Sequence, residues 1–209
     1  MKKNKDLKNI LLFLNKAGNL KKTYRYSETK DKKGDSSADH SWRLALMAII
    51  VTRELNLKIN LLKALEIALI HDLAEAITGD IDYMLIKKGK ITKELKKKNE
   101  LKAINKLTAN LPPKIGRGIF GSWNEYEKTK TKEAKFIKAL DKLETFTQTL
   151  ELGYKQYNHP EYIPNYADKH IAAFPELIPL LMLLKKNLKK EFKKGKIIWK
   201  KEYEKIILK

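Results

Sequence analysis

Four side chains in this sequence combine metal-binding residue types with positions that should be buried. His40 opens the apolar stretch 39–50, the pair His71-Asp72 closes the stretch 62–73, and Asp141 interrupts the stretch 136–143. A buried carboxylate is costly unless an opposite charge or a metal compensates it. Two imidazoles and two carboxylates form a mixed nitrogen and oxygen set that suits a first-row divalent cation. Each residue alone could be a cap, a core residue or a partner of a lysine, but together they predict a metal site.

The elements that must position these side chains have helical patterns. Apolar residues recur at helix spacing from Leu7 to Leu14 and stop at Gly18, and the polar segment 28–38 predicts a loop that ends in a helix N-cap. We expect a break at Pro112-Pro113 and the glycines 116, 118 and 121. No segment keeps a two-residue alternation. The sequence therefore predicts a single all-α domain, a helical bundle with a metal site between helices, with further helices over about 39–55, 60–73, 92–110, 131–157 and 166–194.

The predicted helices indicate the orientation of Asp141 but leave open whether His40 and His71-Asp72 lie close together. His40 lies near the start of one helix and His71-Asp72 near the end of the next, so packing decides whether those two ends meet. Asp141 shares a helical stripe with Ala134 and Ile137, which predicts that it faces inward.

Composition limits the class of protein. The 209 residues are enough for one core, and the absence of cysteine excludes disulfides and thiolate metal ligands. The apolar run after the basic N-terminus is too short for a signal peptide, and the longest run, 177–184, contains Pro179 and is too short to span a membrane. We therefore expect a soluble, cytoplasmic protein without a membrane partner.

The net charge of +20 suggests a nucleic-acid or anionic-membrane surface. The charge lies in three separate segments, 1–33, 85–106 and 185–209, and only four of the 45 basic residues are arginine, the residue preferred for bidentate phosphate contacts. The aromatic residues Trp199 and Tyr203 accompany only the last segment. A lysine coat on solvated helix faces is the favoured interpretation, and nucleic acid is not the expected partner.

The motifs around the four side chains resemble those of a known family. Segments 36–48, 71–81, 123–128 and 131–144, together with 20–26, are similar in order to the motifs of the HD-domain phosphohydrolases that resemble 5′-deoxynucleotidases. The match spans about residues 7–157. Its second motif is the most specific, because Glu75 and Gly79-Asp80 accompany the His71-Asp72 pair.

This resemblance implies one HD domain over residues 1–209, with a motif-bearing core at about 7–157 and a helical extension at 158–209. It implies that His40, His71, Asp72 and Asp141 bind one divalent metal ion, which could be Mn, Co, Zn, Fe, Ni or Mg. It also implies release of phosphate from (deoxy)nucleoside 5′-monophosphates. A homodimer is expected, since dimers are common among similar proteins.

The resemblance also assigns roles beyond the metal ligands. Glu75 is expected to act as a general acid or base, although it could be a helix-terminal residue in a salt bridge. Asp80 is expected to contact the sugar or an active-site water, or equally to be a turn aspartate. Arg25 is expected to bind the phosphate. Tyr26, or its neighbour Tyr24, could stack on the base, and either could instead be a core residue.

Two alternatives remain. The same fold could act as a cyclic-nucleotide phosphodiesterase or a guanosine-tetraphosphate hydrolase, and the short chain and the segment 75–80 favour the nucleotidase. The other alternative is a basic nucleic-acid-binding protein, which should gather basic residues and exposed aromatics in one patch.

Overall fold

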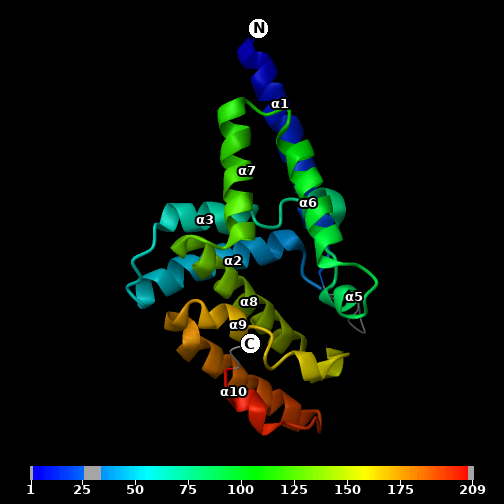
Figure 1. Ribbon diagram of the computed structural model, residues 1–209, viewed down its shortest axis with the longest axis vertical. Coiled ribbons are helices and arrows are strands. Elements are labelled where there is room, and N and C mark those ends of the chain that lie inside the picture. Colours follow the sequence, from blue (N-terminus) through cyan, green and yellow to red (C-terminus); the bar gives the residue numbers. More distant parts are fainter. Residues whose placement is uncertain (1, 26–33, 207–209) are drawn as a thin grey trace.

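The computed structural model describes residues 2–25 and 34–206, which form helices joined by turns (Figure 1). Within these two ranges no strand forms, and the extended backbone pairs only at an isolated antiparallel bridge between Tyr24 and Ser36. The prediction of an all-α fold is therefore confirmed. The α-helices are α1 (Lys2–Ala17), α2 (Ser37–Glu54), α3 (Leu61–Ile70), α4 (Glu75–Thr78), α5 (Tyr83–Lys87), α6 (Lys93–Thr108), α7 (Pro113–Lys128), α8 (Lys132–Leu152), α9 (Asp168–Ala172) and α10 (Ile178–Lys194), and the 3-10 helix η1 (Gly18–Lys22) follows α1.

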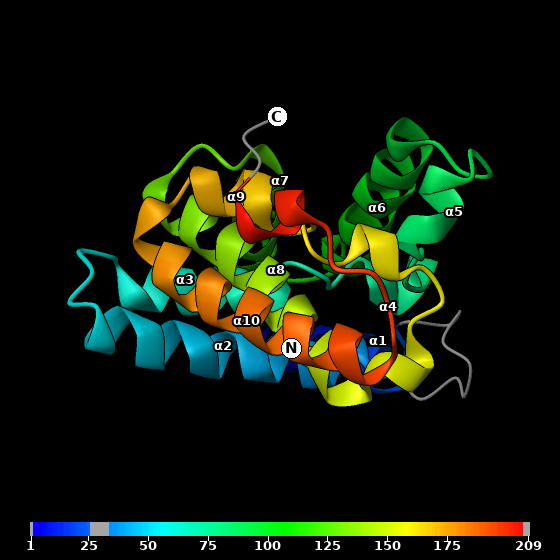
Figure 2. The same cartoon turned by 90° about the horizontal axis from the view of Figure 1, so that it is seen from below.

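The helices form two groups on either side of α2 and α3. Figure 1 shows α1, α6 and α7 above this pair and α8, α9 and α10 below it, and in Figure 2, seen from below, α10 lies in front of α8. Each group has its own apolar cluster. One joins α2, α3, α8, α9 and α10 through residues such as Ile67, Leu140 and Leu188, and the other joins η1, α4, α6 and α7 around Ile104 and Trp123. The chain crosses from the first cluster to the second directly after α3, where His71-Asp72 lies.

The helices expected at 39–55, 60–73, 92–110 and 131–157 correspond to α2, α3, α6 and α8, although α3 and α8 end a few residues earlier than expected. The short helices α4 and α5 were not expected. The predicted N-cap is Ser36, whose hydroxyl accepts from the backbone N–H of Asp39 in a capping box. The expected break is found before Pro113, between α6 and α7, but the glycines 116, 118 and 121 do not belong to it, because α7 runs unbroken through all three. Pro113 occupies the first turn, where its missing N–H costs nothing. The cost of the glycines is offset by apolar burial along one face, notably at Trp123.

A short backbone bridge positions Arg25 next to the start of α2. The N–H of Arg25 donates to the carbonyl of Asp35 at 2.9 Å, and the N–H of Ser37 donates to the carbonyl of Thr23 at 2.8 Å. Gly34 lies so close to this bridge that a Cβ there would be 1.7 Å from the Arg25 carbonyl oxygen. Only glycine fits at this position, so the bridge depends on it.

The C-terminal extension packs on the helices that carry the motifs. In α10, Leu181, Leu188 and Phe192 share the first apolar cluster with Phe136 of α8. A buried ion pair between Lys185 and Asp168, with 2.8 Å between Nζ and Oδ1, ties α10 to α9. The extension therefore contributes to the core that also holds α8.

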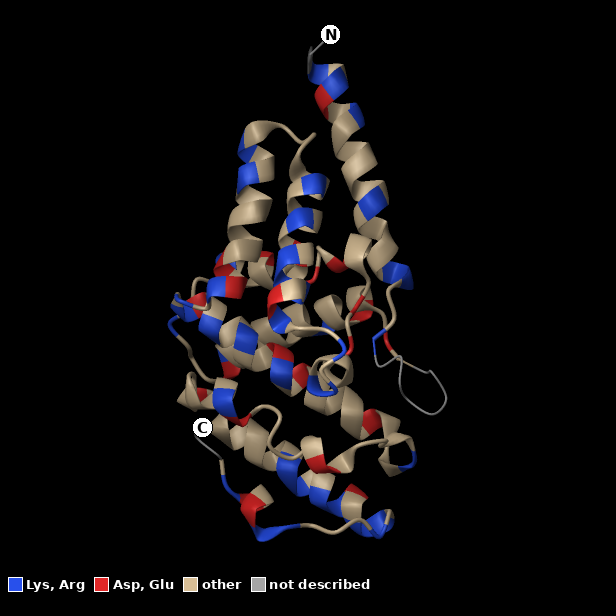
Figure 3. Ribbon diagram, turned by 45° about the vertical axis from the view of Figure 1, so that its right-hand side comes forward, with Lys and Arg blue, Asp and Glu red and all other residues tan. Residues whose placement is uncertain are grey.

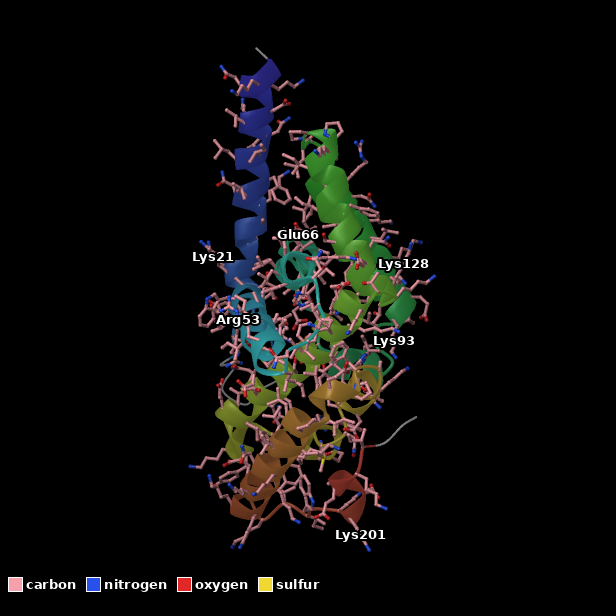
Figure 4. The ribbon with its side chains drawn as sticks, turned by 90° about the vertical axis from the view of Figure 1, so that its left-hand side faces the viewer. Lys21, Arg53, Glu66, Lys93, Lys128 and Lys201 are labelled. Atoms are coloured by element: carbon pink, nitrogen blue, oxygen red, sulfur yellow. The ribbon has the colours of Figure 1, made fainter. Side chains whose placement is uncertain are left out.

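The basic residues are spread over the whole surface. Figure 3 shows lysine and arginine on helices at both ends of the molecule, interspersed with acidic residues, and Figure 4 shows Lys21, Lys128 and Lys201 on different sides of it. This distribution agrees with the interpretation as a solvated coat. None of the described helices has both the length and the apolar character that crossing a bilayer requires.

Candidate active site

The four residues predicted as metal ligands lie together in the structure. The start of α2 meets the end of α3, and this brings the Nε2 atoms of His40 and His71 to 3.2 Å from each other. His71 Nε2 lies 3.1 Å from Asp72 Oδ2, and His40 Nε2 lies 3.8 Å from the same oxygen and 3.3 Å from Asp141 Oδ1. The Nε2 atom of His40 therefore has three oxygen or nitrogen donors around it, two from the adjacent residues His71 and Asp72 and one from Asp141.

Hydrogen bonds at the far side of each ring orient both histidines. His71 Nδ1–H donates to the carbonyl of Ala68 at 2.8 Å, and His40 Nδ1–H donates to the carboxylate of Glu144. Because a carbonyl and a carboxylate only accept, each partner fixes the proton of a neutral ring on Nδ1. Both Nε2 lone pairs then point into the same space, as in histidines that bind metal ions.

The carboxylate of Asp141 is held in the same way. Its Oδ2 accepts a hydrogen bond from the Tyr126 hydroxyl at 2.5 Å and pairs with Lys142 Nζ at 2.8 Å, which leaves Oδ1 facing His40. Burial alone would raise the pKa of Asp141, but Lys142 and His40 hold it well below its usual range. Asp141 is therefore ionised and has one oxygen directed at the histidines.

These donors fit a divalent cation. Nitrogen and carboxylate ligands lie about 2.0–2.2 Å from a transition metal, so ligands of one ion lie roughly 3–3.5 Å from each other. The separations of 3.1–3.8 Å between these atoms are close to this spacing. The ligand atoms of His40, His71 and Asp72 all lie within 4.8 Å of one another, and Asp141 Oδ1 lies beside His40. Imidazole lone pairs and carboxylates gathered in this way repel each other unless a cation lies between them. The donor set is nitrogen and oxygen alone, as the sequence predicted.

Protons compete for the same position. Burial and Arg25 lower the pKa of His40, but its contacts with Asp141 and Glu144 outweigh them and raise the pKa to about 9. Burial raises the pKa of Asp72, but the neighbouring His71 outweighs it, and the net pKa lies below the ordinary value. Without a metal, the site therefore retains a proton on His40 at neutral pH.

Glu75 begins α4, one turn beyond Asp72. Its side chain is buried and accepts a hydrogen bond from the Ser37 hydroxyl at 2.7 Å. Burial raises the pKa of Glu75 well above its usual range, and the nearby carboxylates of Asp72 and Asp80 raise it further. Burial likewise raises the pKa of Asp80. The environment of Glu75 therefore favours its protonated form beside the four clustered side chains.

Of the residues expected to bind the phosphate or stack on the base, the structure places Arg25 beside the site, but not Tyr24. The guanidinium of Arg25 lies beside the site, where it contacts Glu144 Oε2 at 3.4 Å and donates to Thr145 Oγ1 at 3.1 Å. The side chain of Tyr24 is 61% exposed and does not line the cavity at the metal ligands. Tyr26 lies outside the described residues, so its predicted stacking on the base stays a prediction.

The sequence interpretation missed several residues at the site. Glu144 is fully buried and accepts from His40, and Arg43 Nε donates to it at 2.7 Å. Its spacing of three residues from Asp141 places both on one face of α8, a signal that periodicity could have used. Lys142 and Lys96 were also missed. Lys96 of α6 lies in the wall near Glu75 and pairs with Glu100 at 3.4 Å, and its position depends on packing alone.

A cavity of about 510 Å³ opens from the metal ligands. Its lining includes Asp72, Glu75, Asp80 and Arg25, and also Tyr83 of α5 and Tyr162 and Tyr166 of the segment 158–166. Its volume lies in the range of small-molecule sites.

Known proteins are similar to this chain in sequence and in fold. The model of the HD domain family matches residues 17–174. The 5′-deoxynucleotidase HDDC2 of Homo sapiens is 31% identical over 179 residues, which cover 83% of each chain, and that of Xenopus laevis is 33% identical over 179 residues, covering 83% of this chain and 85% of its own. A "predicted metal-dependent phosphohydrolase" of Magnetospirillum magnetotacticum MS-1 superimposes with a TM-score of 0.75 at 22% identity, over 93% of this chain and 97% of its own. The resemblance inferred from the motifs is thus confirmed, and the chain belongs to the HD-domain family.

Proposed function

We propose that this protein is a divalent-metal-dependent phosphomonoesterase that releases phosphate from (deoxy)nucleoside 5′-monophosphates. The observation that carries the proposal is the proximity of His40, His71, Asp72 and Asp141 beside a cavity that Arg25 also lines. The relatives named 5′-deoxynucleotidases support the choice of substrate.

The four ligands would hold one divalent ion, whose identity among Mn, Co, Zn, Fe, Ni and Mg the donor set leaves open. Such an ion supplies Lewis acidity, which lowers the pKa of a coordinated water from about 16 to about 7 and offsets the charge of the phosphate. The protein must then position the phosphate and protonate the departing sugar oxygen.

Glu75 is suited to protonate that oxygen. A general acid must carry its proton near neutral pH, and burial together with Asp72 and Asp80 keeps the pKa of Glu75 high. The Ser37 hydroxyl donates to Glu75 Oε2, which leaves the other oxygen to carry the acidic proton. A positioned general acid contributes roughly 10²–10⁴ in rate.

Arg25 and Asp80 would bind the rest of the substrate near the reacting phosphate. The Arg25 guanidinium is fixed by Glu144 and Thr145 at the edge of the cavity, and charge-assisted contacts of arginine with phosphate oxygens are strong. Asp80 lines the cavity after Gly79, whose φ of +72° is readily adopted only by glycine. We propose that its carboxyl group contacts the sugar or a water molecule.

We also propose that the chain is one domain that acts as a homodimer in the cytoplasm, where nucleoside monophosphates occur. The shared core of α8 and α10 supports one domain. Trp42, Leu46 and Ile50 are exposed at helical spacing on α2, and such an apolar face can pair with its own copy. Light scattering after size-exclusion chromatography checks the dimer, and monomers at micromolar concentration would contradict it.

Phosphate release across deoxy- and ribonucleoside monophosphates, with a panel of divalent metals, tests the function. We expect no release in excess chelator and recovery on addition of one or more metals. A cyclic nucleotide and guanosine tetraphosphate serve as comparison substrates for the alternative activities. Full activity in chelator, with no metal found by elemental analysis, would refute the proposal.

A further inference from the structure

The cavity is larger than the metal ligands and a phosphate group require. Its lining includes aromatic side chains from two segments outside the motifs: Tyr83 at the start of α5, and Tyr162 and Tyr166 in the segment 158–166. A substrate anchored by its phosphate at the metal ligands would extend towards these rings.

A series of contacts connects the metal ligands to the rings. Lys142 pairs with Asp141 at 2.8 Å, and its Nζ lies 5.4 Å from the centre of the Tyr166 ring. The Tyr166 ring meets the Tyr83 ring edge-on, with 6.0 Å between their centres. The aromatic wall is therefore continuous with the site and begins one side chain beyond Asp141.

A lysine joins the outer rings of this wall. Lys87 Nζ lies 5.7 Å from the centre of the Tyr83 ring and 5.0 Å from that of Tyr162. Tyr83 and Tyr162 are each 42% exposed, although aromatic residues are usually more buried. Part of each residue is therefore accessible to a ligand in the cavity.

We propose, on the basis of the function proposed above, that Tyr162, Tyr83 and Tyr166 form the nucleobase subsite. A nucleoside 5′-monophosphate has its charged group and its planar base at opposite ends, and the cavity is lined both by Arg25 and three of the metal ligands and by these rings. Stacking on aromatic rings suits every base, because each has a π-face. The segment 158–166 then binds the base, in place of Tyr24, which is largely exposed and does not line the cavity.

Steady-state kinetics of three variants test the subsite with deoxyadenosine 5′-monophosphate and with 2-deoxyribose 5-phosphate, which lacks the base. For Tyr162→Ala we expect KM to rise about 5- to 150-fold for the nucleotide, the range that loss of one stacked base gives, and to stay unchanged for the sugar phosphate. Tyr162→Phe keeps the ring and should behave as wild type. Tyr24→Ala, a tyrosine of high exposure outside the cavity, is the matched control and should also be normal.

Saturation-transfer NMR measures the same contact without turnover. In chelator, the base protons of deoxyadenosine 5′-monophosphate should receive saturation from the wild type and from Tyr24→Ala, and less from Tyr162→Ala. Equal kinetic effects of Tyr162→Ala on both substrates, an unchanged KM and NMR signal, or an impaired Tyr24→Ala would overturn the subsite. If the wild type releases no phosphate with any metal, the proposed function fails, and the NMR comparison still decides whether these rings bind the base.

Discussion

Replacing Glu144 by glutamine separates the role of this carboxylate from that of the metal ligands themselves. Glu144 is fully buried and accepts hydrogen bonds from His40 Nδ1, from Arg43 Nε at 2.7 Å and from Arg25 Nη1 at 3.4 Å. Burial raises its pKa, but His40 and the two arginines outweigh this effect and keep the carboxylate ionised. Glutamine keeps the size and removes the charge that orients the His40 ring and strengthens its Nε2 as a ligand.

The expected magnitude follows from the position of Glu144 behind a ligand. Loss of a hydrogen-bonding partner of a metal-binding histidine weakens metal affinity about 10- to 100-fold, which corresponds to roughly 1.4–2.7 kcal/mol. Removal of a metal ligand should have a larger effect. We therefore expect Glu144→Gln to bind metal weakly and Asp141→Ala to lose it.

Competition with a chromogenic chelator measures the affinity for Co²⁺ or Mn²⁺. Glu151→Gln is the matched control, because Glu151 Oε2 also pairs with Arg43, at 2.6 Å, but its side chain is 55% exposed. Circular dichroism verifies that each variant is folded. The reasoning is wrong if Glu144→Gln binds metal like the wild type, or if Glu151→Gln is equally impaired.

Three further perturbations test other parts of the site. Glu75→Gln should retain the metal and lose about 10²–10⁴ in kcat, and loss of metal in elemental analysis would contradict the role of Glu75 as an acid. In the metal-free protein, burial lowers the pKa of His40 but its carboxylate partners raise it to about 9, above the unfolded value of 6.5. The stability that His40 contributes is therefore complete below pH 6.5 and lost as pH rises through 9. Because His40 is protonated at pH 7.5 in the metal-free protein, metal uptake at this pH should release a proton. An indicator dye in weak buffer detects the released proton, and metal uptake without proton release would refute the raised pKa of His40. Gly34→Ala should displace Arg25, because its Cβ would lie 1.7 Å from the Arg25 carbonyl oxygen, and should raise KM for the nucleotide. Gly118→Ala, with nothing within 4 Å of the added Cβ, is its control, and equal kinetics of the two variants would show that the bridge does not position Arg25.

The sequence by itself determined most of the longer helices and the identity of the clustered donors. Apolar spacing and caps act over a few residues, so α2, α3, α6 and α8 were predictable. His40, His71-Asp72 and Asp141 were recognisable because buried imidazoles and carboxylates need compensation. The same local logic failed at α7, because the packing of Trp123 outweighs the low helix propensity of three glycines.

Only the tertiary structure decided how the donors are oriented and what surrounds them. The hydrogen bond between His40 and Glu144 joins residues 104 positions apart, and the contact of Arg25 with Glu144 spans 119. Helix spacing gives no information about which helix ends meet. Packing between distant segments brings α2 to the end of α3 and forms the aromatic wall of Tyr83 and Tyr166. The apolar pattern of a helix shows which of its faces is buried, but only the folded chain shows which other face packs against it.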